Sequence, residues 1–378
     1  MANNPPKRQI MELTALLLAV FLAFSTVIGG AYPPTKESAP VKDAFAERNE
    51  PIYPASSLTL SAKAAALITS DGRLLFGKNQ DSPMGMASTT KIMTGLLAAE
   101  YIGKVGLDAA CLVSENAAGI EGSSVYLEVG ERVRLLDLLY ATLLASANDA
   151  ATALAEAVGG SLEAFVTLMN RRAEAMGLSA THFENPHGLA SEGHRTTAYE
   201  LALLTATALE DPLFATVVGT RQYHFTTDRT ARSFTNHNKL LASYEGAIGV
   251  KTGFTKATGR CLSSAAERDG VRLIAVTLSA PDDWADHRAL LDFGFAHTVK
   301  LTLAEVGAHR YSLPTPSGTL TVTNREALTV VLPDTHGEIT CRVELPPLAF
   351  SEEDARICRV LFYEKGKIIA LLPLFPEG

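Results

Sequence analysis

Apolar and polar positions follow two different periods along the first half of this chain. Apolar residues on both sides of Asp71-Gly72, a dipeptide typical of tight turns, predict a β-hairpin over residues 64–76. Over residues 88–102 the apolar positions recur at helical spacing, which predicts an amphipathic helix. The same spacing predicts further helices over residues 133–145, 150–158, 161–176 and 197–209.

The second half of the chain returns to strand patterns. We expect strands over residues 247–254, 261–266 and 271–278, with a turn at residues 269–270. A helix is predicted over about residues 284–295. Strands at both ends with helices between them indicate one α/β domain, whose sheet pairs strands that are distant in sequence.

After about residue 298 the pattern becomes one of strands alone. Hydrophobic and polar residues alternate over 339–345, which is the period of a strand. Two apolar runs, over 360–363 and 368–372, predict another hairpin. We therefore expect an α/β domain over residues 56–297 and a small all-β domain over 298–378.

The first 31 residues have the parts of an export signal. Lys7 and Arg8 precede an uncharged apolar run of 16 residues over 13–28, shorter than the roughly 20 residues that span a bilayer. We expect a signal peptide cleaved after Ala31, with an uncleaved signal anchor as the alternative. Both place the rest of the chain outside the cytoplasm. Residues 32–55 contain five prolines and mixed charges, which predicts a linker.

Composition narrows the function classes. The chain has 378 residues, 47% of them hydrophobic and 20% charged, which is the balance of a globular protein. Its 33 basic and 41 acidic residues give a net charge of −8, so we expect no nucleic-acid partner. Its four cysteines are too few for a disulfide framework and contain no C-x-x-C pair, so we expect neither a cysteine zinc site nor a cofactor.

Residues 88–91 read Ser-Thr-Thr-Lys where a helix is predicted to begin. Spacing i, i+3 places Ser88 and Lys91 on one helix face. A serine hydroxyl is a weak nucleophile until a base takes its proton, and a lysine amine can be that base only when neutral. The site must therefore lower the lysine pKa from its usual value of about 10.4 by desolvation or a nearby positive charge. In isolation, the same spacing also fits an N-cap serine with a solvated lysine.

Two further short motifs follow. Ser146 and Asn148 fall in the predicted break between two helices, where a hydroxyl could relay a proton and an amide could orient a substrate. A helix cap is the alternative. Residues 251–253 read Lys-Thr-Gly on a predicted strand, whose edge could pair with an extended peptide. Lys251 offers a cation for a carboxylate and Gly253 permits close backbone approach, although a solvated strand face is again the alternative.

The three motifs together, in this order, change the interpretation. S-x-x-K, S-D-N and K-T-G are the signature of penicillin-binding proteins and class A β-lactamases, and only Ala147 departs from it here. The chain resembles the D-alanyl-D-alanine carboxypeptidases, which are serine-type penicillin-binding proteins of low molecular mass. The resemblance is strong over about residues 58–297 and looser over 298–378. Family-like blocks lie at residues 86–94, 122–124, 127–131, 137–139, 146–151, 185–189, 236–241 and 249–255.

This resemblance implies a β-lactamase-like fold, in which a helical cluster flanks an antiparallel sheet, followed by a β-rich second domain. It also implies catalytic roles. Ser88 would attack the carbonyl of the penultimate D-alanine in a peptidoglycan stem peptide, with Lys91 as the general base. Ser146 would pass a proton to the leaving D-alanine, and Asn148 would hold the network.

The resemblance assigns the substrate-binding strand in the same way. Lys251 and Thr252 would bind the terminal carboxylate of the substrate, next to Gly253. The backbone N–H groups of Ser88 and Phe254 would form the oxyanion hole. Water would then release the acyl-enzyme, whereas a β-lactam would acylate the serine and leave slowly.

Other functions stay open. A class A β-lactamase activates its deacylating water with a glutamate, which in that family lies in an E-x-x-L-N motif. Glu200 and Glu210 begin such a spacing, but Leu204 and Phe214 stand at the asparagine position. A D,D-endopeptidase acting on cross-links would use the same motifs, and a non-catalytic peptidoglycan-binding module would not need the serine and the lysines. No G-x-S-x-G or H-E-x-x-H motif occurs, and we interpret His187 as structural.

The resemblance also sets the expected partners and location. We expect peptidoglycan stem peptides as substrates and β-lactams as inhibitors. The location would be extracytoplasmic, either secreted or held at the outer face of the cytoplasmic membrane by the N-terminal segment. Residues 371–378 contain two prolines, so we do not expect the amphipathic helix with which many relatives end.

Overall fold

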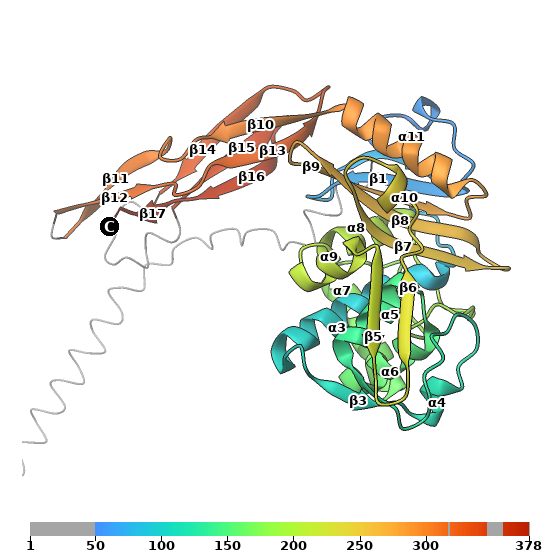
Figure 1. The fold of residues 1–378 in the computed structure, drawn as a ribbon. Helices are drawn as coiled ribbons and strands as arrows, with labels where there is room; N and C mark the ends of the chain where they lie inside the picture. Colours follow the sequence, from blue (N-terminus) through green and yellow to red (C-terminus); the bar gives the residue numbers. More distant parts are fainter. Residues whose placement is uncertain (1–49, 317, 346–357, 378) are drawn as a thin grey trace, which may run out of the picture. The chain divides into compact units, whose positions relative to one another are not determined.

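The structure, a computed structural model, describes residues 50–316, 318–345 and 358–377 (Figure 1). The predicted export segment over residues 1–31 and most of the predicted linker over 32–55 lie outside these residues. In the part of the chain that the structure describes, no single helix is long and apolar enough to cross a bilayer, although two bent pairs of helices reach that length together.

A five-stranded antiparallel sheet organises the first region, in the order β2-β1-β9-β8-β7. Its strands are β1 (Ala64–Thr69), β2 (Leu74–Lys78), β7 (Ala247–Thr255), β8 (Gly259–Arg268) and β9 (Val271–Leu278). Ala64 pairs with Leu278, so strands from opposite ends of this region lie side by side. The predicted β1–β2 and β8–β9 hairpins are confirmed, and so is the pairing of distant strands.

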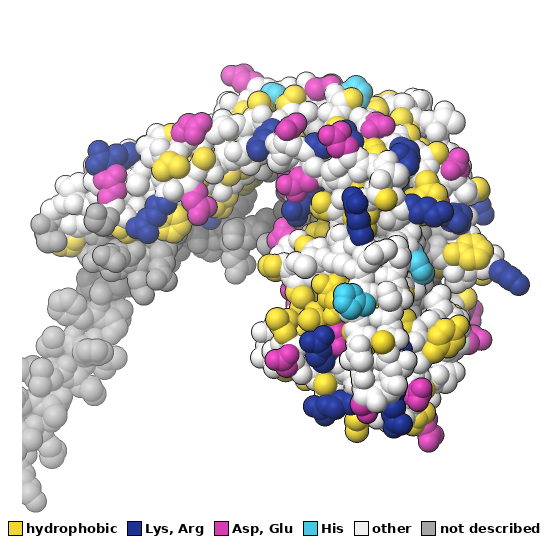
Figure 2. Space-filling view, viewed as in Figure 1, with side chains coloured by type: hydrophobic (Ala, Val, Ile, Leu, Met, Phe, Trp, Pro, Cys, Tyr) yellow, Lys and Arg dark blue, Asp and Glu magenta, His cyan; other side chains and the backbone are white. Residues whose placement is uncertain are grey.

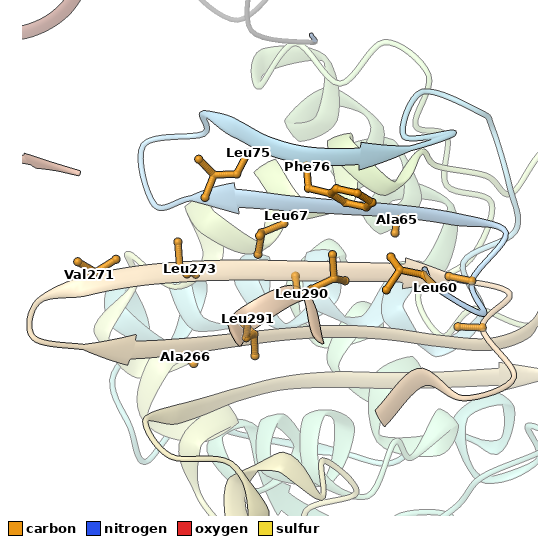
Figure 3. Close-up of a cluster of buried hydrophobic side chains, with 13 residues drawn as sticks. Leu60, Ala65, Leu67, Leu75, Phe76, Ala266, Val271, Leu273, Leu290 and Leu291 are labelled. Atoms are coloured by element: carbon orange, nitrogen blue, oxygen red, sulfur yellow. The ribbon is translucent and has the colours of Figure 1, made fainter. Parts of the chain in front are cut away.

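Helices cover both faces of this sheet. Helix α11 (Asp283–Ala296) packs against one face, where Leu290 joins Leu67 in an apolar cluster (Figure 3). Helix α8 (Ala198–Ala208) packs against β1 and β9 on the other face. Every residue of β1 is therefore buried, which is why residues 64–68 form an unbroken apolar run instead of an alternating one.

The remaining helices form a cluster beside the sheet (Figure 1). They are α3 (Lys91–Val105), α5 (Leu135–Leu144), α6 (Asn148–Gly159), α7 (Leu162–Ala175) and α9 (Pro212–Gly219). The short elements of this region are η1 (Ala55–Ser57), η2 (Ala87–Thr90), β3 (Ala110–Leu112), α4 (Glu115–Ala118), β4 (Arg132–Arg134), β5 (Gln222–Thr226), β6 (Ala231–Thr235) and α10 (Leu240–Ser243). The predicted architecture, an antiparallel sheet flanked by a helical cluster, is confirmed.

Element boundaries differ from the predictions at the motif residues. The helix predicted from Ser88 begins at Lys91, because residues 87–90 form a 3-10 turn. Val133 lies in strand β4, where it pairs with β3, and not in the predicted helix. Asn148 is the first residue of α6 and not part of the break between helices. Apolar spacing marks the body of a helix, whereas its ends depend on hydrogen bonds that the spacing does not encode.

After α11 the described residues form strands only. They are β10 (Thr298–Ala304), β11 (Arg310–Thr315), β12 (Gly318–Thr323), β13 (Leu328–Pro333), β14 (Ile339–Glu344), β15 (Arg359–Glu364), β16 (Lys367–Pro373) and β17 (Phe375–Pro376). Val322, Val360 and Leu372 belong to an apolar cluster of their own. The predicted β-rich region and its β15–β16 hairpin are confirmed, while the domain boundary at residue 297 stays a prediction.

The alternation over residues 339–345 correctly predicted a strand. Ile339 and Val343 of β14 pack against the apolar cluster of this region, whereas residues 340–342, including Cys341, are exposed. On the face of the molecule shown in Figure 2, basic and acidic side chains are interspersed.

Candidate active site

The candidate nucleophile lies on the tight turn that precedes helix α3. Residues 87–90 form the 3-10 turn η2, and Lys91 begins the α-helix. Ser88 is half-buried, whereas its neighbours Ala87 and Thr89 are buried. The turn thus leaves the serine as the accessible residue of this segment, one helical turn from the lysine.

Lys91 contacts three oxygen atoms, and their chemistry orients its amine. Its Nζ lies 2.7 Å from Asn148 Oδ1, 2.5 Å from the His187 carbonyl oxygen and 3.1 Å from Ser88 Oγ. The first two oxygens can only accept hydrogen bonds, so they take two N–H groups. In the neutral amine the remaining position is the lone pair, which faces the Ser88 hydroxyl as a general base must.

The surroundings of Lys91 favour this neutral form. The side chain is completely buried, and burial lowers the pKa of its amine well below the usual value. The positive charge of Lys251 lowers this pKa further, while buried Asp149 opposes the shift. This is the shift that the general-base hypothesis requires.

The second motif supplies one direct contact and one nearby hydroxyl. Asn148 accepts from Lys91 through Oδ1, and its Nδ2 donates to the Glu121 carbonyl oxygen at 2.7 Å. These two bonds fix which way the amide points. Ser146 lies two residues earlier, buried and in the left-handed region at φ 60°. In the described structure no hydrogen bond joins its Oγ to Ser88 or Lys91.

The third motif lies on β7, the edge strand of the sheet (Figure 1). Lys251 is buried, which lowers its pKa to about 7, and its Nζ donates to the Thr252 carbonyl oxygen at 2.8 Å. A Cβ on Gly253 would lie 3.0 Å from Ser88 N, so glycine lets the strand approach the nucleophile turn closely. Phe254, the next residue along the strand, is 63% exposed.

Two backbone groups of the site were missed by sequence reasoning. The carbonyl oxygens of His187 and Glu121 hold Lys91 and Asn148, and a backbone acceptor leaves no mark in the sequence. The His187 side chain accepts from Leu189 N, and burial together with the Lys91 charge lowers its pKa to about 3. The structural interpretation of this side chain is consistent with that contact, but its carbonyl lies in the site. The only available signal was the family-like block at 185–189.

The arrangement is suited to acyl transfer. A hydroxyl lies beside a desolvated amine, and an edge strand that can pair with an extended peptide lies against the nucleophile turn. Lys251 brings a second amine, which can meet a carboxylate. The structure therefore brings the first and third motifs together around Ser88, with Asn148 in contact with Lys91 and Ser146 two residues before Asn148 in the chain.

Comparisons with known proteins agree with this chemistry. Residues 51–282 match the family described as D-alanyl-D-alanine carboxypeptidase. D-alanyl-D-alanine carboxypeptidase DacF of Bacillus subtilis is 38% identical over 249 residues, which are 64% of this chain and 64% of that protein. The D-alanyl-D-alanine carboxypeptidase of Streptomyces sp. K15 is 34% identical over 64% of this chain and 91% of its own length.

Comparisons with solved structures agree with the sequence comparisons. Penicillin binding protein 5 from Haemophilus influenzae matches with a TM-score of 0.70 and 25% identity, over 85% of this chain and 98% of that one. The Streptomyces K15 DD-transpeptidase matches with a TM-score of 0.61 and 32% identity, over 63% of this chain and 98% of that one. The first match covers a larger share of this chain than the second does.

Proposed function

The chain belongs to the D-alanyl-D-alanine carboxypeptidase family of serine peptidases, and we propose that it removes the terminal D-alanine from peptidoglycan stem pentapeptides. The observation that carries this proposal is the position of the Lys91 amine. It is buried, it gives two N–H groups to carbonyl oxygens, and it lies 3.1 Å from Ser88 Oγ. A structural lysine would instead keep its charge and a carboxylate partner.

In the proposed acylation step, Lys91 takes the Ser88 proton while the serine oxygen attacks the penultimate D-alanine carbonyl. The oxyanion is bound by the N–H groups of Ser88 and Phe254. The C–N bond breaks, and the leaving D-alanine amine receives a proton through Ser146. Water then attacks the ester and regenerates the serine.

The third motif orients the substrate in this proposal. Lys251 and Thr252 bind the terminal carboxylate, and the backbone of β7 pairs with the peptide. The lowered pKa of Lys251 supports this role, because a substrate carboxylate would restore the charge that burial disfavours. A β-lactam carries a carboxylate and a reactive amide, so it would acylate Ser88 in the same position and inhibit the enzyme. Because stem peptides occur in the cell wall, we place the enzyme outside the cytoplasm.

Product analysis on a pentapeptide ending in D-Ala-D-Ala tests this proposal. We expect release of one D-alanine by the wild type and none by Ser88→Ala, whose folding is checked by its melting temperature. Labelling with a fluorescent penicillin should likewise require Ser88. A wild type that releases no D-alanine contradicts the proposal, and rapid turnover of the penicillin would favour a β-lactamase.

Transpeptidation is a second candidate, because the Streptomyces K15 structure is that of a DD-transpeptidase. The two reactions share the acyl-enzyme and differ in what attacks it. Adding an amino-acid acceptor to the pentapeptide reaction distinguishes them. Hydrolysis yields a tetrapeptide, whereas transfer yields a peptide that carries the acceptor.

A further inference from the structure

One strained peptide unit in the nucleophile turn carries two groups that matter for the reaction. Ala87 lies in the left-handed region at φ 47°, which is a strained conformation for a non-glycine residue. The described chain has no cis peptide bonds, so the carbonyl of Ala87 and the N–H of Ser88 point in opposite directions from one plane. Fixing the carbonyl on one side therefore aims the N–H on the other.

A buried threonine side chain forms a hydrogen bond with the Ala87 carbonyl oxygen. Thr90 Oγ1 lies 2.7 Å from the Ala87 carbonyl oxygen and 2.6 Å from His194 Nε2. Both side chains are buried, at 0% and 6% exposure, so water does not compete for these bonds. The histidine comes from the segment after α7, far from the turn in sequence.

The hydrogen bond between Glu184 and His194 determines the direction of the two other bonds, those of His194 with Thr90 and of Thr90 with Ala87. The Glu184 N–H donates to His194 Nδ1 at 3.0 Å, so this nitrogen carries no proton. In the neutral ring the proton must then be on Nε2, which donates to Thr90 Oγ1. The hydroxyl is left to donate to the Ala87 carbonyl. Burial lowers the pKa of His194 to about 4, which keeps the ring neutral in ordinary buffers.

Two glycines enclose the same peptide unit. A Cβ on Gly188 would lie 2.0 Å from the Ala87 carbonyl oxygen and 2.9 Å from Ser88 N. A Cβ on Gly253 would lie 3.0 Å from Ser88 N. The peptide is therefore packed by backbone on both sides, and its rotation is limited to what these contacts and the threonine permit.

We propose that His194 and Thr90 form a one-way hydrogen-bond relay that fixes the Ala87 carbonyl and thereby aims the Ser88 N–H at the developing oxyanion. This inference rests on the proposed function, because the oxyanion belongs to the acylation of Ser88. Both are positioning residues, since neither touches the substrate. Their effect should appear in the rate of acylation and not in substrate affinity, because the oxyanion exists only after attack.

The first test compares two variants of Thr90 by stopped-flow acylation with a fluorescent penicillin. Removing one oxyanion-hole donor typically costs about 100-fold to 1000-fold in rate. We expect Thr90→Val, which keeps the shape but loses the hydroxyl, to slow acylation by about 10-fold to 100-fold with noncovalent affinity unchanged. Thr90→Ser should retain most of the wild-type rate. Thr277→Val is the matched control, because Thr277 Oγ1 also lies beside a buried histidine, His287 Nε2, but on the α11 side of the sheet.

The second test distinguishes the roles of the two ring nitrogens of His194. In His194→Gln the amide can occupy the Nε2 position and donate to Thr90, whereas in His194→Asn it can only replace Nδ1 and accept from Glu184 N. We expect the glutamine variant to acylate faster than the asparagine variant, even where both have lowered melting temperatures. A merely structural histidine predicts the opposite order or none.

The outcomes separate this inference from the proposed function. If wild-type Ser88 is not acylated at all, the proposed function fails. If the wild type is acylated and Thr90→Val matches its rate, or slows only as much as Thr277→Val, the relay is wrong. Equal rates for the two His194 variants would also overturn it.

Discussion

Lys91 and Lys251 are buried, and the positive charges of their amines repel each other. Burial lowers the pKa of Lys91 most and the Lys251 charge lowers it further, so the second lysine should contribute to the pH at which the first becomes a base. We predict that Lys251→Met raises the pKa of Lys91 and moves the acid limb of the acylation pH profile to higher pH. Lys251→Arg keeps the charge and should leave the limb near its wild-type position. The measurement is the second-order acylation rate against pH, and an unmoved limb in the methionine variant would refute the coupling.

Gly188 and Gly130 both have positive φ, at 89° and 75°, but their surroundings differ. A Cβ on Gly188 would overlap the Ala87 carbonyl, whereas nothing lies within 4 Å of one on Gly130. We predict that Gly188→Ala abolishes most acylation and costs about 1–3 kcal/mol more than Gly130→Ala, which should cost only about 1 kcal/mol of backbone strain. Urea unfolding and penicillin labelling check this. Equal losses in the two variants would mean that the overlap is relieved without effect.

At this scale the sequence could predict side chains but not backbone partners. Ser88, Lys91 and Asn148 were found because hydroxyl, amine and amide chemistry needs those residue types. The bond from Lys91 to the His187 carbonyl could not be found, since any residue provides a carbonyl and only the folded chain places it. The strain at Ala87 was missed for the same reason, because alanine gives no signal of positive φ.

Among the elements, a buried ion pair joins the β5–β6 hairpin to the loop before β4. Arg232 donates to Glu131 at 2.9 Å, with side-chain exposures of 7% and 0%, and also donates to the Val125 carbonyl oxygen at 2.7 Å. We predict that Arg232→Ala costs about 3–5 kcal/mol, because it leaves the buried Glu131 carboxylate without its charged partner and with only the Glu128 N–H and the Thr227 hydroxyl as donors. Denaturant unfolding measures this loss.

The exposed ion pair of Arg310 and Glu377 provides the control for that measurement. Its arginine side chain is 65% exposed, so Arg310→Ala should cost at most about 1 kcal/mol. Equal costs for the two arginine variants would show that burial does not decide the strength of the Arg232 pair.

Some elements with clear local signals were predicted from the sequence, whereas others with comparable signals were missed. The β7–β8–β9 meander follows from apolar runs separated by turn residues, and its three strands were predicted. The β5–β6 hairpin was missed, although polar and apolar residues alternate over Gln222–Thr226 and its burial follows that alternation, with Phe225 buried and Tyr223 stacked on Tyr140 of α5. Helix α9 was missed as well, although Asp211 caps it and Pro212 opens it. Both of these capping signals can be recognised from the sequence alone.

The whole molecule should lose stability in mild acid. Burial lowers the pKa of His187 and His287 to about 3 and that of His194 to about 4, below the usual 6.5. The unfolded chain therefore binds more protons below pH 6.5, so the stabilisation is complete above that pH and is lost as the pH falls toward 4. Each histidine contributes a slope of at most about 1.4 kcal/mol per pH unit.

Urea midpoints between pH 7.5 and pH 4.5 test this prediction. The wild-type free energy of unfolding should fall across the range, and His287→Gln should show a shallower fall because it removes one of the three groups. A wild-type midpoint that is constant with pH would contradict the burial of these rings as neutral groups.

We also propose that residues 50–297 fold and react without the β-rich region. The Streptomyces K15 structure is covered to 98% by only 63% of this chain, so a relative of that size forms the same fold. We predict that a fragment of residues 50–297 is labelled by a fluorescent penicillin at a rate within about threefold of the full chain, where about 0.6 kcal/mol separates the two barriers. A soluble, folded fragment that does not label would assign the β-rich region a part in the reaction.

The pairing of β1 with β9 also determines when, during synthesis, the active site can form. Ribosomes deliver Ser88 early, but β9 and the strands beside it come late, and distant pairings of this kind form slowly. A chain whose synthesis is incomplete therefore contains Ser88 but still lacks Gly253, which packs against the nucleophile turn, and the charge of Lys251. We therefore expect a chain that has not yet completed the sheet to be inert toward peptide and antibiotic alike.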